Sequence, residues 1–297
     1  MIGWGNMFEK ITRRSFLKLS AGGLLAAAAT SAGGLFYSGQ VETQLLEINN
    51  YKLEREGIPR SFHNKKIVQF SDIHVGFHYN LKQLESLTIE INKIQPDILF
   101  FTGDLFDDPN TYENHESVIP LLKNLEAPLG KFAVFGNHDH GGYGTDIYRK
   151  IMEKSGFTLL VNEAKEVSAG NSGSIFVIGI DDAMLGKPDL KLATQNVPDQ
   201  GFNILLSHAP DLADEASWFN IHLQLSGHSH GGQIQIPLMG ALVKPPFAEK
   251  YVEGFYHAGI NNDMLLYVNR GIGTTRLPFR FLSKPELAVF TLHSREG

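Results

Sequence analysis

The stretch KIVQF at residues 66–70, followed at once by SDIH at 71–74, sets the pattern of this chain. KIVQF is too short for a helix and predicts a buried strand, and Asp72 and His74 come directly after it. Other short apolar runs, bounded by Gly, Pro or polar residues, repeat the pattern. We predict further strands at 97–101, 132–135, 174–180, 202–206, 221–225, 233–236, 265–268 and 286–292.

Helical patterns lie between the early strands. Leucines and isoleucines recur at helical spacing over 81–94, which predicts an amphipathic helix there. A second helix is expected around 147–152, ending near Gly156, and a weaker helical pattern covers 116–125. Strands that alternate with helices favour an α/β fold with parallel strands and helices packed outside them.

Five of the first six expected strands end in a polar cluster. The clusters are SDIH (71–74), TGDLFD (102–107), GNHDH (136–140), SHAP (207–210) and SGHSH (226–230). Because the carboxyl ends of strands in layered α/β folds meet at one rim, these side chains should converge. A single Asp after a strand is more often a turn residue, and a single His is more often structural. A purely structural role for all five clusters would require the same coincidence at five strand ends, so a shared site is the better interpretation.

Composition limits the chemistry of such a rim. The chain has no cysteine, which excludes disulfides, thiolate metal sites and cysteine nucleophiles. Oxygen and imidazole ligands remain, and they suit Zn, Mn or Fe. The net charge is -6, and residues 1–20 carry about +3 of positive charge, so the body is acidic. We therefore expect no nucleic-acid partner, since phosphate-tracking surfaces need clustered Lys and Arg.

The motifs DxH, GDxxD, GNHD, a later His and GHxH, in this order, resemble those of the calcineurin-like metallophosphoesterase superfamily. The resemblance covers about residues 67–290. It implies an α/β fold, a four-layer αββα sandwich of two mixed β-sheets flanked by helices, with a metal site at one rim. GHSHGGQI (227–234) and YVNRGIGTTRLPFRF (267–281) are similar to the branch of exported bacterial phosphodiesterases.

The resemblance also implies a ligand set for two divalent or trivalent ions, either Mn, Zn or Fe. The first metal would take Asp72, His74 and His230, the second would take Asn137, His208 and His228, and Asp104 would bridge both. His138 would lie beside the substrate as an acid for the leaving group, with Asp107 as its partner. The two ions would generate the attacking hydroxide from water.

NRGIGTTRLPFR (269–280) holds three arginines among glycines. Guanidinium groups and backbone amides suit phosphate, so Arg270, Arg276 and Arg280 are candidates for substrate binding. A glycine turn with ordinary surface arginines explains the segment equally well.

The amino terminus carries TRRSFLK (12–18) before an uncharged stretch at 19–40. It resembles a twin-arginine signal, which implies export of the folded body by the twin-arginine translocation machinery. An uncleaved membrane anchor is the alternative. Either reading places the body outside the cytoplasm, in the periplasm or cell envelope, with membrane or cell-wall association. We therefore expect a signal or anchor at 1–40, a linker and leading segment at 41–65, and a catalytic domain at 66–297.

Together these expectations describe an exported dinuclear-metal phosphoesterase, a phosphodiesterase that acts on an envelope phosphoester. Two alternatives stay open. One is hydrolysis of the UDP-2,3-diacylglucosamine pyrophosphate of lipid A biosynthesis, whose substrate is cytoplasmic. The other is a non-catalytic scaffold with the same fold, which the seven retained ligands disfavour.

Overall fold

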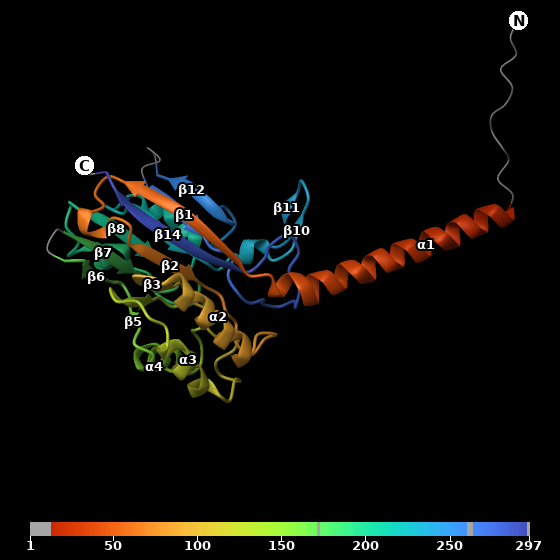
Figure 1. Ribbon diagram of the computed structural model, residues 1–297, viewed down its shortest axis with the longest axis horizontal. Helices are drawn as coiled ribbons and strands as arrows, with labels where there is room; N and C mark the ends of the chain where they lie inside the picture. The colour runs from red at the N-terminus through yellow and green to blue at the C-terminus, as the bar shows by residue number, and fades with distance from the viewer. Residues whose placement is uncertain (1–12, 171–172, 260–263, 296–297) are drawn as a thin grey trace, which may run out of the picture.

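The computed structural model describes residues 13–170, 173–259 and 264–295. Two six-stranded mixed sheets pack face to face, and helices cover their outer sides (Figure 1). The expected four-layer αββα sandwich is confirmed. In the first sheet the order is β1 (Glu47–Arg55), β14 (Glu286–Ser294), β2 (Lys66–Phe70), β3 (Ile98–Phe101), β4 (Lys131–Ala133) and β5 (Thr158–Leu159).

The second sheet also has six strands and also combines parallel and antiparallel pairs. Its order is β12 (Gly254–Ala258), β13 (Met264–Val268), β9 (Leu223–Ser226), β8 (Phe202–Leu206), β7 (Ser174–Gly179) and β6 (Glu163–Ser168). Its four central strands, β13, β9, β8 and β7, run parallel, as do β2 to β5 in the first sheet. The carboxyl ends of these strands therefore meet at one rim. A separate antiparallel hairpin joins β10 (Gln235–Ile236) to β11 (Gly240–Ala241).

Helices form the outer layers. The helices are α2 (Leu81–Ile94), α3 (Ile119–Lys123) and α4 (Gly144–Lys154) on the first sheet, and α5 (Leu190–Thr194) and α6 (Ala213–Ala216) on the second. The predicted helix 81–94 is confirmed residue for residue. Asn80 caps it, because its side chain accepts from the Gln83 amide while the Gln83 side chain accepts from the Asn80 amide. Leu84, Leu87 and Ile91 are buried against the sheet.

The segment 41–65, expected as a linker and leading segment, belongs to the body of the domain. Strand β1 lies within it and pairs in parallel with β14. Ile58 and Phe62, in the stretch after β1, are fully buried between the two sheets. The sequence did not reveal this strand because β1 is an edge strand, in which exposed residues alternate with half-buried ones.

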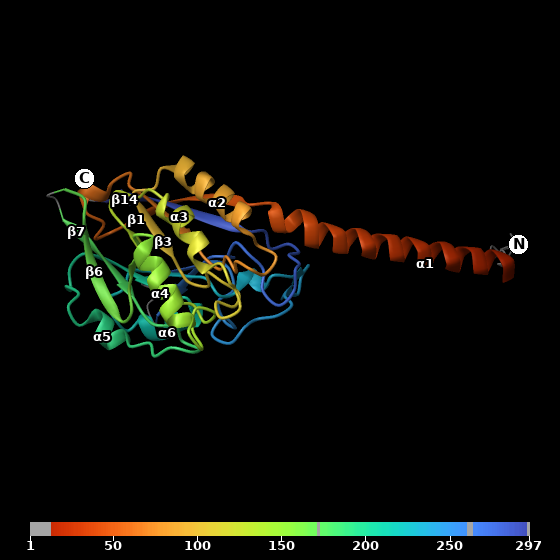
Figure 2. The ribbon, with the colours of Figure 1, turned by 90° about the horizontal axis from the view of Figure 1, so that it is seen from below.

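Helix α1 (Arg13–Phe36) leaves the body and extends away from it (Figures 1 and 2). By length and composition the helical stretch from Phe16 to Gln44 could cross a membrane. Leu24 and Leu25 are more than 70% exposed. The residues that follow α1 dock on the body: Ser38 and Glu42 are buried, and Glu42 Oε1 accepts from the Ser283 amide at 2.8 Å.

Candidate metal centre

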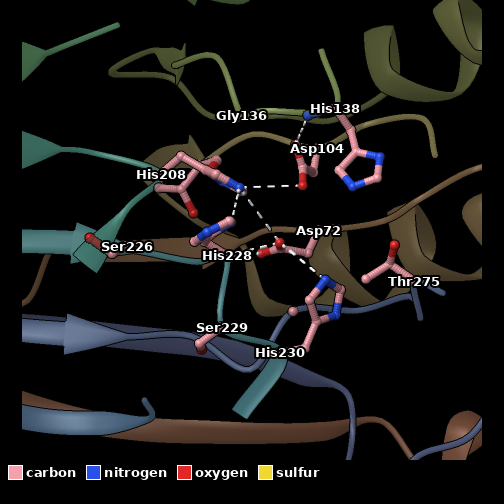
Figure 3. A network of polar contacts seen from close by, with 12 residues as sticks. Asp72, Asp104, Gly136, His138, His208, Ser226, His228, Ser229, His230 and Thr275 are labelled. Atoms are coloured by element: carbon pink, nitrogen blue, oxygen red, sulfur yellow. Dashed lines mark hydrogen bonds and ion pairs between the residues drawn. The ribbon is translucent and has the colours of Figure 1, made fainter. Parts of the chain in front are cut away.

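The five polar clusters meet at the rim where the parallel strands end (Figure 3). Asp72 and His74 follow β2, and Asp104 follows β3. The second sheet contributes imidazoles, with His208 after β8 and both His228 and His230 after β9; Asn137 and His138 follow β4. Carboxylates from one sheet thus face imidazoles from the other. The convergence expected from the sequence is what the fold produces.

Two groups of donors lie side by side at this rim. In the first, the ligand atoms of Asp72, His74 and His230 lie within 4.8 Å of one another. His230 Nε2 is 3.4 Å from Asp72 Oδ1 and 3.1 Å from His74 Nε2. In the second, Asp104, His208 and His228 meet the same limit. His208 Nε2 is 3.1 Å from His228 Nδ1.

Asp104 belongs to the second group, and with His74 and His138 it forms a third group that links the two. Its Oδ2 lies 3.5 Å from His74 Nε2 and 3.3 Å from His208 Nε2. Its other oxygen, Oδ1, accepts from the His138 amide at 2.9 Å, which fixes the carboxylate. Burial alone would raise the pKa of Asp104, but the nearby imidazoles, His208 first, hold it well below its usual range. The carboxylate is therefore ionised and points between the two groups.

The donor set fits metal ions. Two pairs of ring nitrogens lie 3.1 Å apart beside buried carboxylates, and such a set of nitrogen and oxygen donors can bind a metal ion. Asn137 Oδ1 is buried without a hydrogen-bond partner among the described residues, as expected of a donor reserved for an ion. Burial lowers the pKa of His228 and lowers that of His230 further, so both rings favour the neutral form that ligates.

The backbone is unusual at these positions. Five of the seven expected ligands have positive φ, a region that residues other than glycine seldom adopt. They are Asp72 (53°), His74 (51°), Asp104 (61°), His228 (69°) and His230 (52°). Such conformations cost free energy and persist where the surrounding structure imposes them, as it does at functional sites.

Glycines make room for the carboxylates. A Cβ atom on Gly136 would lie 2.2 Å from Asp104 Oδ1, and one on Gly227 would lie 2.3 Å from Asp72 Oδ2. Both distances are far below van der Waals contact. Glycine is therefore required at both positions, because each loop approaches a carboxylate closely. The loop of Gly136 lies against Asp104, and the loop of Gly227 lies against Asp72.

Asp139 was present in the GNHDH cluster, but its role was not anticipated. Its carboxylate accepts from the amides of Asp104, Leu105 and Gly136 at 2.8, 3.0 and 2.8 Å. It is buried, and burial together with the charge of Asp104 raises its pKa to about 7. Asp139 fastens the loop after β4 to the loop after β3. An acceptor for three backbone amides cannot be recognised before the two loops are brought together.

His138 and Asp107 are adjacent, but not in the way expected. His138 Nδ1 lies 2.5 Å from the backbone oxygen of Asp107 and 4.0 Å from its carboxylate. The carboxylate is 3.2 Å from His74 Nδ1 and accepts from the Thr275 hydroxyl at 3.1 Å. Asp107 therefore holds His138 through its carbonyl and orients His74 through its side chain. The contribution of Thr275 was missed, because 168 residues separate it from Asp107.

The three candidate arginines occupy different environments. Arg276 is exposed and lines the cavity beside the metal centre. Arg270 is paired with Glu47 at 2.8 Å and lies 3.4 Å from Glu286. Arg280 is fully buried, donates to the Gly273 carbonyl at 2.9 Å, and lies 3.3 Å from His230 Nδ1. The guanidinium groups of Arg270 and Arg280 are engaged inside the protein, whereas Arg276 lines the cavity.

A cavity of about 340 Å³ opens beside the donors. Its lining includes Asp104, Asn137, His138, His228 and His230. The lining also contains apolar side chains, which are Met184, Ile234, Leu242, Val243, Pro245 and Leu277. The cavity therefore offers a charged end and an apolar wall to one bound molecule.

Comparisons with known proteins agree with this geometry. Residues 65–232 match the model of the calcineurin-like phosphoesterase family. An uncharacterized metallophosphoesterase of Bacillus subtilis, YkuE, is 45% identical over 96% of this chain and 99% of its own length. An uncharacterized metallophosphoesterase of Aquifex aeolicus is 30% identical, with 86% of this chain and 95% of that protein covered. The UDP-2,3-diacylglucosamine pyrophosphatase LpxG of Chlamydia trachomatis is 28% identical, with coverages of 85% and 91%. The chain belongs to the calcineurin-like phosphoesterase family.

Proposed function

We propose that the protein is an exported phosphodiesterase that uses two metal ions to hydrolyse a phosphoester of the cell envelope. The position of Asp104 carries this proposal. Its Oδ2 lies 3.5 Å from an imidazole of one donor group and 3.3 Å from an imidazole of the other. A carboxylate so placed can bind one ion on each side, as expected for a centre with two metals.

Asp72, His74 and His230 would hold the first ion, and Asn137, His208 and His228 the second, with Asp104 between them. When bound, two such ions neutralise phosphoryl charge and lower the pKa of water to near neutrality. Asp104 sets the separation of the two positions. Neutral imidazoles and the Asn137 amide add ligands without cancelling the positive charge that attracts an anionic ester.

His138 is the proposed acid for the leaving group. The Asp107 carbonyl engages Nδ1, so Nε2 is the nitrogen left for the substrate, and the residue lines the cavity. From there the ring can hydrogen-bond a phosphoryl oxygen or give a proton to the departing alkoxide. His138 is held at two points, since its amide donates to Asp104 Oδ1 and its Nδ1 contacts the Asp107 carbonyl.

The shape of the cavity supports a diester. A monoester presents a single organic group, whereas a diester has a second one that needs a place beside the metal centre. The apolar part of the cavity lining offers that place, and Arg276, which also lines the cavity, suits an anionic oxygen. Export is supported by Arg13 and Arg14 at the start of the exposed helix α1.

Metal analysis combined with a substrate panel tests the proposal. The purified full chain is loaded separately with Mn, Zn or Fe, and bound metal is counted by mass spectrometry. Activity is then measured on bis(p-nitrophenyl) phosphate, p-nitrophenyl phosphate, teichoic acid and glycerophosphodiesters. We expect two ions per chain and faster turnover of diesters. Activity confined to monoesters refutes the diesterase assignment. If the chain binds no metal, the proposal that it is a metal-dependent phosphoesterase is refuted.

Pyrophosphate hydrolysis is the second candidate, since the relative LpxG is named a UDP-2,3-diacylglucosamine pyrophosphatase. The same donors would serve a pyrophosphate bond, and the apolar wall would accept an acyl chain. Adding this substrate to the panel decides between the two. The location of the body, tested with a reporter fused at the carboxyl terminus, decides whether the cytoplasmic substrate is within reach.

A further inference from the structure

The β10–β11 hairpin and the loop that follows it expose apolar side chains. Leu238, at the tip, is fully exposed, and Met239 beside it is 80% exposed. Leu242 and Val243, which follow β11, are more than half exposed. Soluble proteins seldom leave such a group of apolar residues in water, and a contiguous exposed patch usually marks a contact surface.

The hairpin is fixed to the root of α1. The Arg280 amide donates to the Ser38 carbonyl at 2.9 Å. The neighbouring residue, Phe281, exchanges hydrogen bonds with the hairpin strand: its amide donates to Gln233 and its carbonyl accepts from Gln235, at 2.9 and 2.8 Å. Both ribbon views show α1 leaving from the end of the body that carries this hairpin (Figures 1 and 2).

Helix α1 has the dimensions of a membrane span. Its 24 residues measure about 36 Å at 1.5 Å per residue, and the hydrocarbon core of a bilayer is about 30 Å thick. With α1 in a bilayer, the membrane surface lies at the carboxyl end of the helix. The hairpin lies at this same end of the body, so its apolar tip would lie near the same surface.

The exposed apolar surface continues into the cavity. Leu242 and Val243 belong to both, because they are exposed on the loop and also line the cavity with Ile234. His138 and Asp104 line the same cavity. A molecule that reaches the metal centre along this wall can therefore keep its apolar part close to the hairpin.

We propose that the β10–β11 hairpin rests on the bilayer that α1 spans, and that the cavity takes a phosphoester whose apolar part stays among the acyl chains. The substrate class rests on the proposed function. The membrane contact does not, since it follows from the exposed tip and from its attachment to the root of α1.

Site-specific labelling tests the contact. The chain has no cysteine, so Met239→Cys gives one labelling site, and Leu192→Cys on α5, where the leucine is 45% exposed, is the matched control. The full chain is labelled with a nitrobenzoxadiazole fluorophore and reconstituted into phosphatidylcholine–phosphatidylglycerol vesicles. At position 239 we expect a several-fold weaker quenching by iodide than at 192, and strong quenching by lipids brominated in the acyl chain.

Two results would overturn the contact. If the label at 239 responds like the label at 192, the hairpin lies in water. If it is shielded from iodide but not reached by brominated lipid, a protein surface covers the hairpin instead. Neither readout depends on catalysis.

The substrate class is tested with the double variant Leu238→Glu, Met239→Glu, and with Leu192→Glu as control. Activity on a phosphodiester lipid embedded in vesicles should fall at least about tenfold in the double variant, and activity on soluble bis(p-nitrophenyl) phosphate should not change. An equal loss on both substrates, or no loss on vesicles, overturns the lipid assignment. Inactivity of the parent chain on every phosphoester would instead refute the proposed function, while the quenching result stands by itself.

Discussion

Asp107 shows how one residue can serve two neighbours through different atoms. Its backbone carbonyl is 2.5 Å from His138, and its carboxylate is 3.2 Å from His74, an expected metal ligand. Burial alone would raise the pKa of Asp107, but the contact with His74 outweighs it and lowers the pKa. The side chain therefore remains ionised and can hold the His74 ring in one orientation, which increases its strength as a ligand.

This division of roles predicts the effect of Asp107→Asn. The variant keeps the carbonyl that holds His138 but removes the charge beside His74. Metal affinity should fall by about 10–100-fold, and turnover at saturating metal should stay within a few-fold of the parent. Metal titration followed by activity separates the two quantities. A large drop in turnover at saturating metal, with affinity unchanged, would show that the carboxylate acts on His138 after all.

His138→Ala should have the opposite effect. The ring lies at the cavity and contacts the Asp107 carbonyl, so its removal should lower turnover by about 10²–10⁴-fold while both ions stay bound. A diester with a good leaving group, such as p-nitrophenol, should lose less activity than an alkyl diester, because it needs less protonation. Loss of metal from this variant would contradict the assignment.

At the scale of elements, the loops after the strands, and not the strands themselves, decide the geometry of the site. Two of these loops bring a glycine against a carboxylate, and Asp139 ties two of them together through three amides. The strands supply the direction, since β2, β3, β8 and β9 all end at the same rim.

Gly227→Ala should therefore damage the metal centre. The new methyl group would lie 2.0 Å from Ser71 Oγ and 2.3 Å from Asp72 Oδ2, so the loop must shift. We expect a loss of metal at the first position and a destabilisation of about 1–3 kcal/mol, measured by mass spectrometry and urea unfolding. Leu84→Ala on α2 is the control. It should destabilise by about 2–5 kcal/mol and keep its metal. Equal metal content in both variants would mean that the loop tolerates the methyl group.

The sequence predicted these strand ends well, because buried strands are short apolar runs and the polar residues that follow them stand out. It failed for β1, β6 and β12, which lie at sheet edges and alternate exposed and half-buried residues. The roles of the arginines could not be predicted either. Arg270 pairs with Glu47, 223 residues away, and no local pattern reports a partner at that distance.

At the scale of the whole molecule, the metal centre joins the two sheets. Asp72 and Asp104 follow strands of the first sheet, and His208, His228 and His230 follow strands of the second. Bound ions would thus cross-link the layers at their rim. Anything that binds the folded protein but not the unfolded chain shifts the unfolding equilibrium toward the folded state.

Removal of metal should therefore lower thermal stability. With free metal at about 100 times the Kd, binding at one position contributes about 2.7 kcal/mol. Treatment with EDTA should lower Tm by several degrees, and Mn or Zn should restore it, as followed by differential scanning fluorimetry. Asp104→Asn provides the comparison, because its Tm should respond less to EDTA. If EDTA does not change the Tm of the parent chain, the ions do not connect the sheets.

Arg280 connects the residues that follow α1 to the metal centre. Its amide donates to the carbonyl of Ser38, which lies just after α1 in the chain, and its guanidinium lies 3.3 Å from His230 Nδ1. A displacement of α1 would therefore be transmitted through Arg280 to His230, an expected metal ligand.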